Sequence, residues 1–301
     1  MWLLFSLFSI LAWSGSDLFS KLGSRPDDSY SHWKMVMAVG LVMGAHAIFE
    51  MTIGGVDFDW NSVMIYLPVS ALYILSMIFG YAGLRYIELS ISSPICNSSG
   101  ALVAVLTLLF VGGEDYSPLA LLAIALVCVG AIGLGVVDAT EDPELRAERQ
   151  KDGNYKYAKS FLALALPVAY CILDAAGTFA DNRVLETLDE GSANCAYELT
   201  FLAAAVFCFI YVVLIKKDRL VPKMEGPKYL GAICETAGQF AYIYAIADTS
   251  HLAMSAPIIS SYCAASVLWS RLFLKEKLSW KHYGMICLVV IGIAIMGIFD
   301  L

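Results

Sequence analysis

The sequence predicts an all-helical integral membrane protein whose ten transmembrane helices form two inverted five-helix repeats. First, 59% of the 301 residues are hydrophobic and only 15% are charged, a balance far from that of soluble domains. Second, the first 16 residues contain no ionisable side chain, and apolar blocks of this kind recur roughly ten times along the chain. Third, the only long hydrophilic stretch divides these blocks into five and five.

Each apolar block is long enough to cross a bilayer, which takes about 20 residues of helix. The blocks are continuously apolar and do not alternate in the way of barrel strands, so membrane helices are expected. No Lys or Arg precedes Lys21 and no small-residue cleavage site follows a short apolar core, so the first block is expected to stay as a helix. The expected spans are 2–23, 33–54, 62–85, 91–112, 117–138, 158–182, 195–215, 228–248, 250–272 and 281–300.

The positive charges are strongly asymmetric about these spans. All of the 19 Lys and Arg residues except Arg183 fall in or beside the odd-numbered loops. Because positive loops are retained in the cytoplasm, the odd-numbered loops are expected inside the cell and both termini outside. The net charge of −8 therefore reflects sidedness and gives no indication of a nucleic-acid partner.

The hydrophilic stretch from Thr140 to Lys159 carries charges of both signs. It predicts a cytoplasmic linker, 140–157, between a first repeat, 1–139, and a second repeat, 158–301. Because five is odd, the second repeat would enter the membrane from the opposite side, which makes the repeat inverted.

Matching residues in the two halves favour this duplication. The segment AWSGSD ending at Asp17 corresponds to AYCILD ending at Asp174. Further pairs follow in the same order along the chain: Tyr81/Tyr244, Pro94/Pro257, Glu114–Ser117/Glu276–Ser279, Gly130/Gly292, Gly135/Gly297 and Asp138/Asp300.

Each half closes with a Phe, a Glu-x-x-Ser turn and a glycine-rich helix, in FVGGEDYSPLALLAIALVCVGAIGLG and FLKEKLSWKHYGMICLVVIGIAIMG. With these motifs the chain resembles the drug/metabolite transporter superfamily, specifically its ten-helix EamA-type members, over nearly its whole length. The Phe-to-Glu spacing differs by one residue between the halves. The resemblance implies transport by alternating access, with a central cavity between the halves; the motifs are structural and carry no cargo identity.

Ionisable side chains inside the spans are candidates for cargo or coupling-ion binding, because a charge in the bilayer costs several kcal/mol and usually faces a cavity or a partner. Trp13 lies four residues before Asp17, and Tyr170 lies four residues before Asp174, so each ring shares a helix face with a carboxylate. Such a pair suits an organic cation. For Asp17 an ion pair with Lys21 is an equally weighted interpretation, and Asp174 is alternatively a hydrogen-bonded helix end.

Glu235, Gln239 and Tyr242 form a polar stripe at i, i+4 and i+7 on the eighth span. We expect this stripe to line the cavity, although polar side chains also join membrane helices structurally. Glu198 begins the seventh span and is either a binding residue or an interfacial one. His46 and Glu50, at i and i+4, suit a proton relay or, more simply, a solvated rim.

Pro94 and Pro257 stand early in the fourth and ninth spans and are followed by polar residues, among them Asn97 and Ser261. Proline frees backbone carbonyl groups and bends helices, so the two positions are candidate gates. The alternative is that each proline only starts its helix. Glycines such as Gly130 and Gly292 predict close packing of the last helix of each half, between the halves or in a dimer.

The eight cysteines are scattered without a CxxC or a histidine at ligand spacing, so no metal or cofactor is expected. The sequence lacks nucleotide-binding, serine-hydrolase and zinc-protease motifs. The predicted function is therefore a secondary transporter of the cell membrane, an exporter or exchanger of small organic metabolites such as amines or amino acids, with protons as a candidate coupling ion and a monomer or homodimer as the assembly. A membrane enzyme and a sensory or structural membrane protein are the alternatives.

Overall fold

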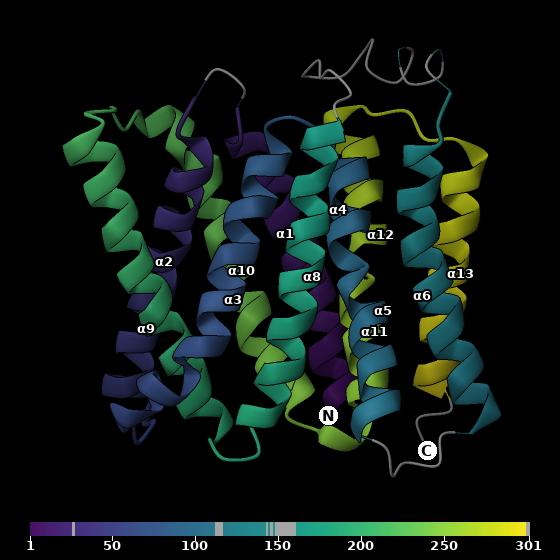
Figure 1. Ribbon diagram of the computed structural model, residues 1–301, viewed down its shortest axis with the longest axis horizontal. Coiled ribbons are helices and arrows are strands. Elements are labelled where there is room, and N and C mark those ends of the chain that lie inside the picture. The colour runs from purple at the N-terminus through teal and green to yellow at the C-terminus, as the bar shows by residue number, and fades with distance from the viewer. Residues whose placement is uncertain (26–27, 112–116, 143, 145–146, 148–160, 299–301) are drawn as a thin grey trace.

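The computed structural model describes residues 1–25, 28–111, 117–142, 144, 147 and 161–298. Within these ranges the chain is built of helices joined by turns, and no strand occurs. The helices stand side by side in one elongated bundle, with the start of α1 and the end of α13 on the same side (Figure 1). We call this side the terminal end and the opposite side the linker end. The predicted all-helical fold is confirmed.

The first half contains five helical rods, of which the second and fourth change to π-helix in their last turns. Its elements are α1 (Trp2–Gly23), α2 (Ser31–Phe49) with η1 (Glu50–Gly54), α3 (Asn61–Leu84), α4 (Leu89–Asn97) followed by α5 (Ser99–Leu106) and η2 (Thr107–Val111), and α6 (Pro118–Ala139).

The second half repeats this order, with π-helical turns again at the ends of its second and fourth rods. Its elements are α8 (Phe161–Val184), α9 (Glu190–Phe209) with η3 (Ile210–Ile215), α10 (Pro222–Ile246), η4 (Thr249–His251) leading into α11 (Leu252–Ser260), α12 (Tyr262–Trp269) and η5 (Ser270–Leu274), and α13 (Trp280–Ile298).

Eight helices in the described part of the chain are long and apolar enough to cross a membrane, against the ten spans expected from the sequence. They are Trp2–Gly23, Ser31–Gly54, Asn61–Leu84, Leu89–Phe110, Pro118–Val137, Ala163–Val184, Glu190–Ile215 and Leu252–Leu274. The other two expected spans correspond to α10, which has 25 residues but carries Lys and Glu in its first turns, and to α13, whose apolar part is the shorter Trp280–Ile295. The chain is a multi-pass membrane protein.

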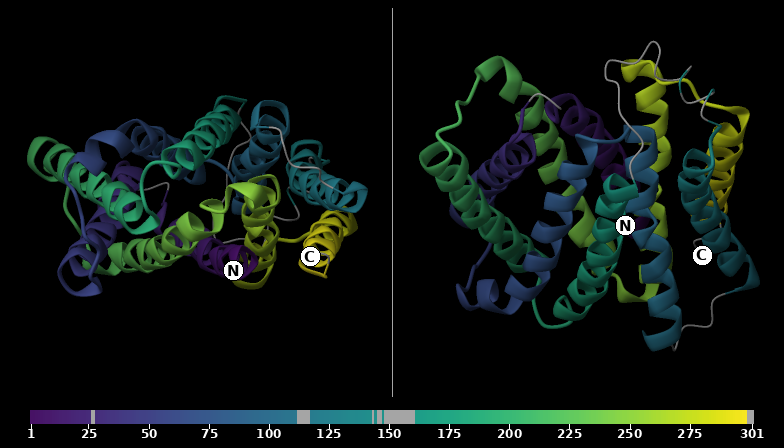
Figure 2. Two further views of the ribbon diagram at one scale, coloured as in Figure 1. Left: turned by 90° about the horizontal axis from the view of Figure 1, so that it is seen from below. Right: turned by 45° about the horizontal axis from the view of Figure 1, so that its top comes forward.

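Helices of one half pack along helices of the other: α1 along α10, α3 along α8, α2 along α9, and α6 along α13. The views in Figure 2 show α6 and α13 side by side at one edge of the elongated bundle. Small residues permit this approach. A Cβ atom on Gly130 would lie 2.9 Å from the carbonyl oxygen of Met285, and one on Gly292 would lie 2.8 Å from that of Ala123. The glycines of the last helices therefore join the two halves of one chain.

The fourth and ninth rods are interrupted at matching places. Pro94 is the sixth residue of α4 and Pro257 the sixth of α11, so the interpretation that each proline only starts its helix is wrong. Each rod is interrupted four residues after its proline, at Ser98 and Ser261. The interruption is slight, because both serines keep helical φ values of −61° and −68°. Among the repeat pairs, Glu114 and Asp300 lie outside the described residues, as does most of the expected linker.

Candidate functional site: two pockets that meet at Glu235

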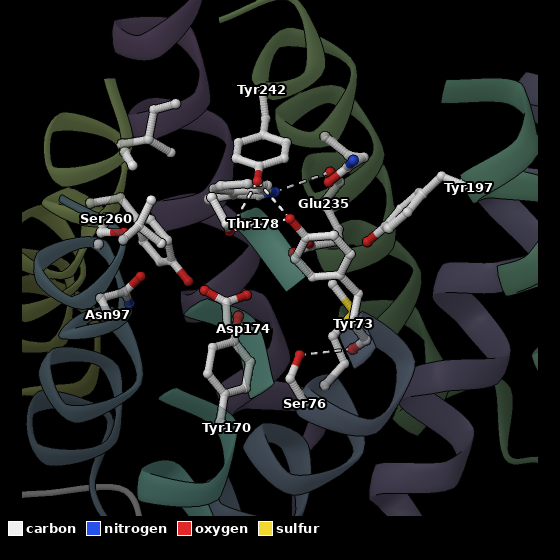
Figure 3. A pocket seen from close by; sticks show the side chains of 18 residues that line it. Tyr73, Ser76, Asn97, Tyr170, Asp174, Thr178, Tyr197, Glu235, Tyr242 and Ser260 are labelled. Atoms are coloured by element: carbon white, nitrogen blue, oxygen red, sulfur yellow. Dashed lines mark hydrogen bonds between the residues drawn. The ribbon is translucent and has the colours of Figure 1, made fainter. Parts of the chain in front are cut away.

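A central pocket lies among α1, α3, α4, α5 and α8 to α12, with about 540 Å³ of empty space including the part open to the surroundings. It is lined by aromatic and polar side chains from both halves of the chain, which point toward one another in Figure 3. Its lining consists of Trp13, Tyr73, Ser76, Met77, Asn97, Gly100, Val103, Tyr170, Asp174, Thr178, Tyr197, Glu235, Gln239, Tyr242, Ala256, Ile259, Ser260 and Tyr262.

Two carboxyl groups belong to this lining, and each is held by a serine from a helix of the other half. The Oε2 atom of Glu235 accepts a hydrogen bond from the hydroxyl of Ser16 at 2.8 Å. The Oδ2 atom of Asp174 accepts one from Ser99, beside the interruption of the fourth rod, at 2.7 Å. Among the described residues that line the pocket there is no Lys, Arg or His, so its ionisable groups are acidic.

Six aromatic rings surround these acids. The ring of Trp13 lies 5.1 Å from that of Tyr242 and 5.7 Å from that of Tyr262, measured between centroids. The indole N–H of Trp13 donates to the backbone carbonyl of Glu235 at 3.3 Å. This contact depends on Gly238, where a Cβ atom would come within 2.6 Å of the indole nitrogen. The other lining aromatics are Tyr73, Tyr170 and Tyr197.

The predicted stripe of α10 faces this pocket along its length, since Glu235, Gln239 and Tyr242 all line it. Gln239 is 2% exposed. Its side-chain nitrogen has no hydrogen-bond partner within the described part of the structure. A buried amide donor without a partner costs free energy, so a polar group of a bound solute would satisfy it.

A second pocket lies toward the linker end, where α1 and α3 finish. It shares Met77, Tyr170, Glu235 and Tyr262 with the central pocket. Its remaining lining is Ser16, Asp17, Ser20, Gly80, Tyr81, Leu84, Ser92, Ser93 and Cys96. We call it the linker-end pocket; the two pockets meet at Glu235.

Asp17 belongs to the linker-end pocket and not to an ion pair with Lys21. Its Oδ2 atom accepts hydrogen bonds from Ser93 and, at 2.7 Å, from Ser266. The ammonium group of Lys21 donates instead to the carbonyl oxygens of Leu84 and Ile87, both at 2.6 Å. The alternative interpretation of Asp17 is therefore wrong.

The two ring and carboxylate pairs predicted from spacing differ in the structure. Tyr170 and Asp174 line the same central pocket, with Tyr170 directly below Asp174 in Figure 3. Trp13 lines the central pocket whereas Asp17 lines the linker-end pocket. Asn97 also lines the central pocket, and its amide donates to the backbone carbonyl of Ser93 at 2.9 Å.

Glu198 lies away from both pockets. Its side chain is fully buried within the protein. Nδ1 of His46 lies 2.9 Å from both carboxylate oxygens of Glu198. Nε2 of His46 lies 3.7 Å from Glu50. Ser261 does not line either pocket; its hydroxyl donates to the carbonyl of Ile258.

The structure adds residues that the sequence analysis missed. Ser16, Ser93, Ser99 and Ser266 hold the carboxylates, but isolated serines in apolar helices give no signal that separates them from packing residues. Asp181, which is fully buried in α8, could have been predicted from its spacing in the sequence. It continues the face of Asp174 and Thr178 at i+7, the same spacing as the stripe on α10.

Residues 164–298 match the model of the EamA-like transporter family. This half of the chain is therefore similar to EamA-like transporters. The match confirms the resemblance to EamA-type transporters that the sequence motifs indicated. It points to a membrane transporter of the drug/metabolite type.

The fold extends beyond the matched half. A solved structure, titled "Crystal structure of protein", superposes with a TM-score of 0.64 at 14% identity. The match covers 98% of this chain and 96% of that one, so both halves of the chain share its fold. Comparison with curated proteins gives no match.

Proposed function

We propose that this EamA-like protein is a secondary transporter of small organic solutes that carry a positive charge, such as amines or amino acids. The observation that carries the proposal is the central pocket, whose described lining combines Asp174 and Glu235 with six aromatic rings and no basic side chain. Carboxylates and ring faces both attract an organic cation. The unpartnered amide of Gln239 would hydrogen-bond a polar group on the same solute.

Alternating access is the proposed mechanism. The central pocket lies toward the terminal end and the linker-end pocket toward the other, and they share Glu235 and Tyr170. In the central pocket a solute would bind Asp174 and Glu235. In the linker-end pocket the same solute would bind Glu235 and Asp17. Protein motion that opens one pocket while closing the other would carry the solute across without a continuous channel.

The proposal includes ten membrane helices in two inverted repeats. Its support is the pairing of helices between the halves. The first helix of one half packs along the third of the other in both directions, as α1 with α10 and α8 with α3. The second helices pair as α2 with α9, and the fifth as α6 with α13. A two-fold axis in the membrane plane generates these pairs.

We place the linker end in the cytoplasm and both termini outside the cell membrane. The support is the distribution of Lys and Arg, which fall in or beside the odd-numbered loops of the sequence with the exception of Arg183. The proposed direction is export or exchange. The proposed assembly is a monomer or homodimer.

The interrupted rods are the proposed gates. Pro94 and Asn97 precede the interruption at Ser98, and Pro257 precedes the interruption at Ser261. The serines that hold Asp17 and Asp174 flank these interruptions. A change in occupancy of either carboxylate would therefore act directly on a rod that has lost part of its helical hydrogen bonding.

Protons are the proposed coupling ion. Glu235 and Asp174 would alternate between a protonated state and a cargo-bound state, so that one proton exchanges for one positive charge of cargo. Coupling of this kind needs no nucleotide or cofactor.

The test is thermal unfolding of detergent-purified protein with amino acids, amines, nucleosides and sugars, for wild type and Glu235→Gln. A ligand at 100 times its Kd stabilises by about 2.7 kcal/mol. Stabilisation by amines or amino acids in wild type, lost in Glu235→Gln, is the expected result. Stabilisation only by neutral or anionic solutes, equal in both proteins, would refute the cation-binding pocket.

A further inference from the structure

A buried carboxyl group lies one hydroxyl away from the central pocket. Asp181 of α8 is 0% exposed and does not belong to the pocket lining. The hydroxyl of Tyr66 donates to its Oδ1 atom at 2.5 Å. The hydroxyl of Tyr73 donates to its Oδ2 atom at 3.3 Å. Asp181 is therefore held by tyrosine hydroxyls on both oxygens.

The second of these tyrosines connects Asp181 to the pocket. The hydroxyl of Tyr73 lies 2.6 Å from that of Tyr242 and 3.2 Å from that of Thr178. The hydroxyl of Tyr242 also donates to Thr178, at 3.0 Å. These three residues line the central pocket, where their hydroxyls converge in Figure 3. Every link from the pocket to Asp181 is thus a group that both donates and accepts a hydrogen bond.

No cation among the described residues pairs with Asp181. The groups that face it are Tyr66 and Tyr73 of α3, Tyr197 of α9 and Tyr242 of α10. On its own helix the nearest polar neighbours are Thr178 and Asn182, whose amide donates to the carbonyl of Ile246; Asp174 lies two turns away. None of the ion pairs in the described structure includes Asp181. A charge so buried without a counter-charge costs several kcal/mol, and binding a proton removes that charge.

We propose that Asp181 is a proton-binding site of the transport cycle, connected to the central pocket through the hydroxyls of Tyr242 and Tyr73. A proton from the pocket adds to the oxygen of Tyr73, directly or by way of Tyr242, as the hydroxyl proton of Tyr73 moves to Oδ2 of Asp181. Each hydroxyl receives one proton and gives one, so the tyrosines are restored and the carboxylate becomes a carboxylic acid. The reverse sequence returns the proton.

This inference rests on the proposed function and deepens it, because it adds to Glu235 and Asp174 a proton-binding residue that does not meet the cargo. Asp174 and Glu235 line the pocket and meet the cargo, whereas Asp181 lies behind its wall. Once Asp181 is protonated, Oδ2 no longer requires the proton of Tyr73. The hydroxyls of Tyr73 and Tyr242 can then donate into the pocket, so proton binding would change the hydrogen bonds that the pocket offers a solute.

The test is an infrared pH titration of the purified protein without any solute, in wild type, Asp181→Asn and Glu186→Gln. Glu186 is an exposed carboxylate five residues later that pairs with Arg183 and serves as the control. We expect a carbonyl band of a protonated buried carboxyl group that titrates in wild type and Glu186→Gln and is lost in Asp181→Asn. An unchanged set of bands in Asp181→Asn would overturn the proposal.

Two tyrosine variants keep the proposal testable if Asp181→Asn does not fold. Tyr66→Phe removes the hydrogen bond to Oδ1 without interrupting the path, so the band should move to higher frequency and still exchange rapidly in D2O. Tyr73→Phe interrupts the path, so exchange of the Asp181 proton should slow at least tenfold. Equal exchange in the two variants would show that the hydroxyl path is not used. Because no solute is added, these outcomes are independent of whether the solute panel gives a ligand.

Discussion

The hydroxyl of Ser16 on α1 donates a hydrogen bond of 2.8 Å to the carboxylate of Glu235 on α10. This bond joins the two halves of the chain at the residue that the two pockets share. Because the same carboxylate lines both pockets and accepts this hydrogen bond, a solute that binds Glu235 in either pocket would also affect the contact between α1 and α10.

Glu235→Gln separates these two roles. The glutamine keeps an oxygen that accepts from Ser16 but removes the charge, so the protein should fold while losing cation binding. A hydrogen bond to a charged group is worth about 1.5–3 kcal/mol, so we expect affinity for the cationic solute to fall roughly tenfold to a hundredfold. The measurement is solute counterflow in proteoliposomes at several pH values.

The matched control is Ser16→Ala, which keeps the charge and removes the donor. It should lower stability by about 1 kcal/mol and retain pH-dependent transport. Retained pH dependence in Glu235→Gln would exclude Glu235 as the coupling residue.

Gly100 allows the two interrupted rods to touch. A Cβ atom at this position would lie 2.5 Å from Cβ of Ser260 and 2.8 Å from the carbonyl oxygen of Ala256. Gly100→Ala should therefore force α5 and α11 apart and lower the free energy of unfolding by about 1–3 kcal/mol. Chemical denaturation in detergent measures this change.

Gly284 of α13 provides the comparison, because a Cβ atom there meets nothing within 4 Å. Gly284→Ala should be neutral or stabilising by up to about 1 kcal/mol, the difference in helix propensity. Equal effects of the two substitutions would mean that the contact between the rods is not tight.

The fold could be predicted from the sequence because lipid imposes a strong constraint. A backbone that crosses a bilayer must satisfy its own hydrogen bonds, so the apolar blocks indicated helices whatever their packing. The stripe of Glu235, Gln239 and Tyr242 was likewise readable, since side chains at i, i+4 and i+7 share a helix face whichever helix they meet.

The predictions about the site that failed depended on contacts between helices, which the sequence does not show. Spacing along α1 put Trp13 and Asp17 on one face, yet each lines a different pocket because α4 and α12 bring Ser93 and Ser266 to Asp17. Lys21 was the only local partner that the sequence offered to Asp17, but the free carbonyls at the end of α3 bind it instead. The position of Glu198 along the seventh span gave no indication that His46 of α2 lies against it.

A charged network holds the linker end of the bundle. Lys228 of α10 is fully buried, with Nζ 3.0 Å from Glu225 and 3.6 Å from Asp28. Nζ of Lys34 on α2 lies 2.7 Å from Asp218 and 3.2 Å from Asp28. The network thus ties α2 and the loop before it to α10 and the loop before that.

Lys228→Met should leave Glu225 and Asp28 buried with only one of their two lysine partners. Breaking a buried pair costs about 3–5 kcal/mol, so we expect a large loss of thermal stability. Lys223→Met, at an exposed position of the same helix, should change stability by less than about 0.5 kcal/mol. Similar unfolding midpoints for the two variants would show that Lys228 does not hold the network.

Asp189 caps α9 at the terminal end, where its side chain accepts a hydrogen bond of 2.9 Å from the backbone N–H of Ser192. Burial raises the pKa of Asp189, but hydrogen bonds from the side chain and backbone of Ser192 and from nearby backbone N–H groups outweigh it and lower the pKa below 3.8. Asp189→Ala should cost about 1 kcal/mol of stability near neutral pH.

The pH dependence of this cost has a definite sign. Because the pKa of Asp189 is lower in the folded state, its stabilisation is complete above the unfolded pKa of about 3.9 and is lost as pH falls through the folded pKa. The stability difference between wild type and Asp189→Ala should therefore be constant from neutral pH to about pH 5 and shrink at lower pH. Asp189→Asn keeps an uncharged capping oxygen, so its stability relative to Asp189→Ala should not vary with pH. A difference between wild type and Asp189→Ala that grows on acidification would contradict the charged cap.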